Sequence, residues 1–155
     1  MAESLIRTLS SLQRHPTETG PSLDRLLFVD PDIRFRESMR PHFEGIFSVD
    51  FIGSLKDAEK MLSGNIYSAV STELILPEVM SDSLEIQKVS SEEGMRNGNQ
   101  VISISRQQGL YVVVLTNVPY LVEKTRAHKL YDKHLIYQSG MMQDYLRSLQ
   151  KKMKS

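Results

Sequence analysis

Four polar side chains of this sequence could do chemistry together, because they stand where apolar, strand-length runs end. Asp30, Glu73 and Thr116 each directly follow such a run, and Asp32 lies two positions beyond the first of them. Carboxylate oxygens are the ligands that hard divalent cations prefer. Asp30 and Asp32, with Glu73, are therefore candidates for a weak Mg²⁺ site, whereas helix capping is the alternative role for Asp32.

The composition excludes several other kinds of chemistry. Without cysteine, the chain has no disulfides, no thiol catalysis and no Cys-based zinc site. Nineteen basic and nineteen acidic residues give a formal net charge of zero, so no overall field attracts nucleic acid or an anionic membrane. The sequence contains no glycine-rich phosphate loop and no nucleophile elbow, and its four histidines lack metal-ligand spacing. We expect a cytoplasmic protein without a cofactor.

The elements that would position these residues alternate between strand and helix patterns. We expect strands near 25–30, 47–52, 67–72, 110–115 and 134–137, and helices over 32–43, 54–62, 117 to about 131, and 141–153. This alternation predicts an α/β fold, a doubly wound five-stranded parallel sheet with helices on both faces. The length of 155 residues fits one ordinary domain.

Two segments stand apart from this pattern. Residues 1–23 form an N-terminal extension, in which 3–13 reads as a short amphipathic helix with Leu5, Ile6, Leu9 and Leu12 on one face. Residues 78–100 are rich in Ser, Glu, Asp and Gly and are interpreted as an insertion, a solvated loop by default. Residues 101–105 fit a helix or a strand equally well. The main domain is expected over 24–155.

The order of elements and a few residues together resemble a bacterial response-regulator receiver domain over about residues 24–151. In that family two acids after the first strand hold Mg²⁺ and an aspartate after the third strand accepts a phosphoryl group. A Thr or Ser ends the fourth strand, and a lysine ends the fifth. The resemblance implies a flavodoxin-like receiver fold.

The receiver pattern is only partly matched. Asp30 stands at the first acidic position, but Pro31 replaces the second acid, with Asp32 one place further along. Glu73 replaces the phospho-accepting aspartate, and Thr116 matches the hydroxyl position. The family's usual spacing of 22 residues from that threonine leads to Gln138, where lysine is expected.

These departures suggest a degenerate, pseudo-receiver domain. The resemblance then implies a phosphorylation-independent module that is not an enzyme and acts by protein–protein interaction in a two-component-type pathway. Its partner, another protein or a second copy, would bind the face formed by residues 120–153, with the 3–13 helix as a further contact. The alternatives are a conventional regulator phosphorylated on Glu73 and a small ligand-binding α/β protein.

Two hypotheses remain for Glu73. Its longer carboxylate could imitate a phosphorylated aspartate and hydrogen-bond Thr116, which would hold an active-like state without a kinase. Alternatively, Glu73 is a solvated relic of lost catalysis. The sequence favours the second hypothesis, because a neutral Gln138 cannot supply the cation that would clamp the carboxylate.

Overall fold

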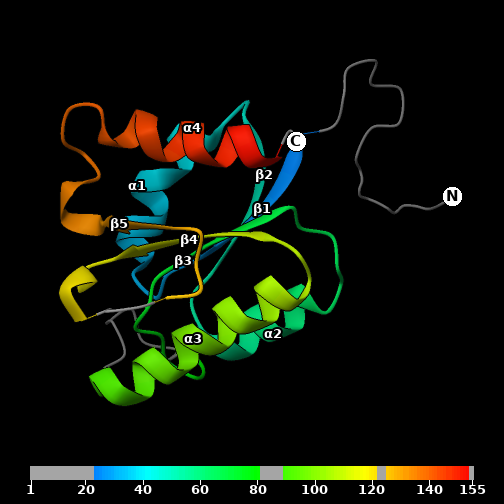
Figure 1. Cartoon of the computed structure of the whole chain (residues 1–155), viewed down its shortest axis with the longest axis vertical. Coiled ribbons are helices and arrows are strands. Elements are labelled where there is room, and N and C mark those ends of the chain that lie inside the picture. Colours follow the sequence, from blue (N-terminus) through cyan, green and yellow to red (C-terminus); the bar gives the residue numbers. More distant parts are fainter. Residues whose placement is uncertain (1–22, 81–88, 122–124, 154–155) are drawn as a thin grey trace, which may run out of the picture.

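A five-stranded, all-parallel sheet forms the centre of the molecule, with two helices on each face (Figure 1). The structure, a computed structural model, describes residues 23–80, 89–121 and 125–153. The strands are β1 (Asp24–Val29), β2 (Phe47–Ile52), β3 (Ala69–Thr72), β4 (Tyr111–Thr116) and β5 (Lys129–Asp132). The helices are α1 (Ile33–Phe43), α2 (Leu55–Leu62), α3 (Ser91–Gln107) and α4 (Met141–Met153), with short 3₁₀ turns η1 (Pro119–Leu121) and η2 (Lys133–Leu135).

The strand order β2-β1-β3-β4-β5 confirms the predicted doubly wound fold. The chain moves outward from β1 to β2, then crosses back to β3 and continues in the opposite direction. Ligand sites in such sheets lie at the carboxyl ends of the strands, beside the point where the order reverses. That point lies between β1 and β3, and it places the residues after these two strands at the same edge.

Two apolar layers hold the helices on the sheet. Phe28, Phe43 and Tyr145 lie in the layer beneath α1 and α4, with Phe28 and Phe43 in an edge-to-face contact at 5.7 Å. Leu27, Val70 and Val101 belong to the opposite layer, beneath α2 and α3. Because successive side chains of a strand point to opposite faces, neighbours such as Leu27 and Phe28 serve different layers.

Helix capping follows the predictions from the sequence. The side chain of Asp32 accepts hydrogen bonds from the backbone amides of Arg34 and Phe35, at 3.0 and 3.3 Å, and so begins α1. Ser54 accepts from the amide of Asp57 at 3.2 Å and begins α2. Side-chain oxygens at this position satisfy amides that have no partner inside the helix.

The structure corrects the expectation of a loop through residues 78–100, because α3 begins at Ser91 and includes both of its glycines. A Cβ atom on Gly98 would lie 1.9 Å from the carbonyl oxygen of Leu74, and one on Gly94 would lie 2.5 Å from a side-chain methyl of Ile75. Glycine is therefore required here by close approach of the helix to the segment after β3, which outweighs its low helix propensity. Residues 101–105 are helical, whereas 81–88 lie outside the described residues.

The segment after β4 also differs from expectation. The helix predicted from Asn117 to about Tyr131 is absent from the described residues there, which form only the 3₁₀ turn η1 before β5. The fifth strand is Lys129–Asp132 rather than 134–137, in register with β4 through pairs such as Thr116 with Asp132. Inter-strand backbone hydrogen bonds fix that register, and a four-residue run carries too little local pattern to reveal it.

The C-terminal helix and the N-terminal extension complete the comparison with the sequence. Helix α4 spans the residues that the sequence predicted. The 3–13 helix and most of the extension lie outside the described residues. Among the described helices, none has the length and apolarity needed to span a bilayer.

Candidate functional site

The carboxyl edge of the sheet gathers four chemically active side chains from four different strands. Asp30 follows β1, Glu73 follows β3, Thr116 ends β4 and Lys133 follows β5. All four are at least 92 % buried by their residue exposures, which are 1 %, 5 %, 0 % and 8 %. Because parallel strands end at the same edge, this site needs no special loop to assemble it.

Lys133 lies at the centre of this group. Its ammonium donates hydrogen bonds to one oxygen of Asp30 at 2.8 Å and to one oxygen of Glu73 at 3.2 Å. The same ammonium lies 4.6 Å from the ring centroid of Phe35, on α1. One cation therefore compensates two buried carboxylates, with an aromatic face beside it.

The structure corrects the position that the sequence assigned to the lysine. Gln138, expected there, is exposed and follows η2, whereas Lys133 makes the contacts that the pattern assigns to a lysine. The spacing from Thr116 is 133 − 116 = 17 residues instead of 22, because 3₁₀ turn η1 and a short connection replace the expected helix. The sequence signal was the lysine directly after the Lys129–Asp132 run, which a fixed spacing overlooked.

The carboxylate of Glu73 is held on both oxygens. Oε2 accepts from the backbone amides of Leu74 at 2.6 Å and Ile75 at 3.2 Å. Oε1 accepts from Lys133 and, at 3.4 Å, from the amide of Asn117. Glu73 is thus a buried, ion-paired side chain, which contradicts the hypothesis of a solvated relic.

Asp30 is equally constrained. Its Oδ1 accepts from the amide of Asp32 at 2.9 Å, while its Oδ2 accepts from Lys133. Burial raises the pKa of Asp30 to about 6, against the opposing influence of Lys133. Burial also disfavours the charge of Lys133, but the carboxylates of Asp30 and Glu73 raise its pKa above the ordinary value.

Thr116 does not make the contact that a phosphate-imitating glutamate would require. Its hydroxyl oxygen accepts a hydrogen bond from the backbone amide of Val118 at 3.1 Å. Between Thr116 and Glu73, both of which the structure describes, no hydrogen bond is formed. Thr116 therefore closes the turn after β4, a common role for a hydroxyl at this position.

The residues present do not fit Mg²⁺, the metal that the receiver resemblance suggests. Pro31 has no ligating side chain, and Asp32 caps α1. The oxygens of Asp30 and Glu73 already accept hydrogen bonds from amides and from an ammonium, whereas Mg²⁺ requires several free oxygen ligands. Among the described residues, no group of three His, Cys, Asp or Glu side chains has the arrangement of a metal site.

Comparison with solved structures establishes the fold. The chain superposes on the signal receiver domain of an HD domain-containing protein from Pseudomonas fluorescens with a TM-score of 0.63, at 13 % identity, covering 90 % of this chain and 96 % of that one. The receiver domain of the response regulator NarL from Mycobacterium tuberculosis gives 0.59 at 15 % identity, with 87 % and 99 % covered. The chain has the receiver-domain fold.

A third receiver domain, the CheY-like protein from Methanospirillum hungatei, gives a TM-score of 0.58 at 14 % identity, with 86 % of this chain and 95 % of that one covered. No family model matches the sequence, and no curated protein matches it. The receiver fold is therefore visible in the backbone arrangement of this chain, although its sequence has diverged far from those structures.

Proposed function

We propose that this chain is a phosphorylation-independent signalling module with a receiver fold, which acts through protein–protein contacts and catalyses no reaction. The observation that carries the proposal is the position of Lys133, whose ammonium joins the carboxylates of Asp30 and Glu73 in a buried cluster. The two groups that would bind the metal and accept the phosphoryl group instead satisfy one another.

The chemistry of Glu73 supports this proposal. In-line phosphoryl transfer needs an accessible carboxylate oxygen and a cation to neutralise charge on the phosphoryl group. Glu73 has both oxygens bound, one of them by two backbone amides. Its extra methylene also moves the carboxylate by more than the roughly 1 Å error that costs such reactions heavily.

The same cluster supports a fixed state rather than a switching one. The sequence argued against a held glutamate because no cation faced it, but Lys133 supplies that cation. A buried ion pair fixes geometry more than it adds stability. We therefore propose that Glu73 permanently occupies the place of a switchable aspartate, through Lys133 and the Asn117 amide rather than through Thr116.

Intact-mass measurement after incubation with acetyl phosphate and Mg²⁺ tests the proposal. The wild-type chain and Glu73→Asp should gain no phosphoryl group, since Pro31 still withholds a metal ligand. Pro31→Asp combined with Glu73→Asp restores both acids and is the variant expected to react. Glu73→Gln is the negative control. Stoichiometric phosphorylation of the wild-type chain on Glu73 would instead establish the conventional regulator.

The face proposed for the partner runs over residues 120–153, from η1 through β5 and η2 to α4. It exposes Tyr120 at 77 %, Leu121 at 40 % and Tyr137 at 56 %. Exposed tyrosines of this kind are enriched in protein interfaces. Tyr120 follows Thr116 by four residues, so this face adjoins the buried cluster.

A second copy is the first partner to test for this face. Light scattering over a range of concentrations should show a dimer that Tyr120→Ser weakens. Ile66→Ser is the matched control, because Ile66 is 50 % exposed and precedes β3, at the opposite edge of the sheet. Equal weakening by both variants would argue against this face.

A further inference from the structure

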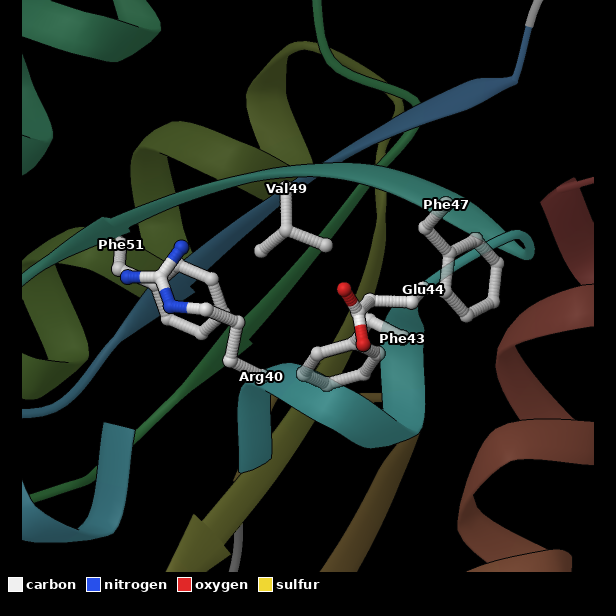
Figure 2. A pocket seen from close by; sticks show the side chains of 6 residues that line it. All are labelled: Arg40, Phe43, Glu44, Phe47, Val49 and Phe51. Atoms are coloured by element: carbon white, nitrogen blue, oxygen red, sulfur yellow. The ribbon is translucent and has the colours of Figure 1, made fainter. Parts of the chain in front are cut away.

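A hollow of about 200 Å³ opens on the surface where the end of α1 meets the edge strand β2 (Figure 2). Four of its six lining side chains are apolar: Phe43, Phe47, Val49 and Phe51. The first of these comes from α1, and the other three alternate along one face of β2. Such a concave apolar surface on an edge strand is suited to an aliphatic side chain.

Two charged residues border the hollow. The guanidinium of Arg40 stacks over the ring of Phe51, with its central carbon 4.3 Å from the ring centroid. Glu44, at the other side, is exposed directly after α1. In Figure 2 both side chains lie at the rim and the aromatic rings line the walls, so the centre of the hollow is apolar.

The chain enters the fold beside this hollow. Asp24, the first residue of β1, is the register partner of Phe47, a lining residue, and adjacent strands lie about 4.8 Å apart. Leu23, immediately before it, is 45 % exposed. The 22 residues that precede Leu23 therefore start next to the hollow, and they include the apolar positions Leu5, Ile6, Leu9 and Leu12.

We propose that residues 3–13 dock in this hollow on their own domain, with Leu9 and its apolar neighbours against Val49 and the surrounding rings. The connecting residues 14–22 extend to about 30 Å at most, which reaches any part of the hollow from Asp24. A short tether gives an effective concentration in the millimolar range, so the segment of the same chain outcompetes a second copy at micromolar protein. This inference does not depend on the proposed function.

Disulfide trapping in the full chain tests the contact, because the natural sequence contains no cysteine. Leu9→Cys with Val49→Cys should form a disulfide within one chain at least ten times faster than Ser11→Cys with Val49→Cys. Ser11 is the matched control, since at about 100° per residue it lies on the face of the predicted helix opposite Leu9. Equal rates would overturn the proposal, and so would a disulfide formed mainly between two chains, which would indicate a second copy.

Thermal unfolding of single variants gives an independent readout. Leu9→Asp should lower Tm by about 2–4 °C, the usual effect of roughly 1 kcal/mol in a chain of this size, while Ser11→Asp should leave Tm unchanged. If neither variant changes Tm, the segment makes no stabilising contact and the proposal fails.

Discussion

The ammonium of Lys133 donates a 2.8 Å hydrogen bond to the carboxylate of Asp30, a residue 103 positions earlier in the chain. The two residues follow β5 and β1, and strands β3 and β4 lie between these in the sheet. Their contact therefore joins distant strands across the carboxyl edge. Glu73, after the intervening β3, shares the same ammonium at 3.2 Å.

Replacing Lys133 should strongly destabilise the fold. Lys133→Met leaves two buried carboxylates without a cation, and breaking a buried pair in this way costs about 3–5 kcal/mol. Urea unfolding measures the change. Lys129→Met is the control, because Lys129 is 47 % exposed and 3.9 Å from Asp144, so its loss should cost less than about 1 kcal/mol. Similar losses for both variants would show that the buried cluster has no special role.

The stability of the protein should depend on the ionisation of Asp30. Burial raises the pKa of Asp30 in the folded state from 3.8 to about 6, so the folded state binds this proton more tightly than the unfolded chain. The contribution of Asp30 is thus most favourable below pH 4, declines between pH 4 and 6, and is constant above that range, falling by about 3 kcal/mol in total.

Comparison with Asp30→Asn isolates this effect. The free energy of unfolding of the wild type, minus that of the variant, should fall as the pH rises from 4 to 6. Chemical denaturation at several pH values measures the difference. Parallel profiles for the two proteins would show that the pKa of Asp30 is unchanged by folding.

Gly98→Ala should destabilise the protein although alanine is the better helix former. The added Cβ would lie 1.9 Å from the carbonyl oxygen of Leu74, so α3 must move away from the segment after β3. Overpacking of this kind costs about 1–3 kcal/mol, more than the roughly 1 kcal/mol gained in helix propensity. In Gly64→Ala, the nearest atom lies at 3.5 Å, and thermal unfolding should show little change. A stabilised Gly98→Ala would contradict the close approach.

The hydroxyls of Tyr145 and Ser71 should be coupled. They lie 2.5 Å apart, between α4 and β3, and both side chains are fully buried. Tyr145→Phe or Ser71→Ala alone leaves one polar group without this partner and should cost about 1–3 kcal/mol. The double variant removes both groups and should cost less than the sum. Additive losses in a double-mutant cycle would show that the two hydroxyls do not interact.

The sequence by itself determined most of the architecture. Buried strands such as β4 read as continuous apolar runs, and Asp32 and Ser54 mark helix starts through their side-chain oxygens. These signals are local, because each depends on residues within a few positions of one another. They were sufficient to predict the doubly wound sheet and to place Asp30 and Glu73 at its carboxyl edge.

Tertiary structure alone decided where β5 runs and which residue is the cation of the site. The segment Lys129–Asp132 becomes a strand because it pairs with β4, and this pairing brings Lys133 rather than Gln138 to Asp30 and Glu73. The glycines of α3 show the same principle, since their cost as helix residues is outweighed only by close contact with Leu74 and Ile75. Contacts between residues far apart in the chain leave no periodic trace in a single sequence, and therefore only the fold reveals them.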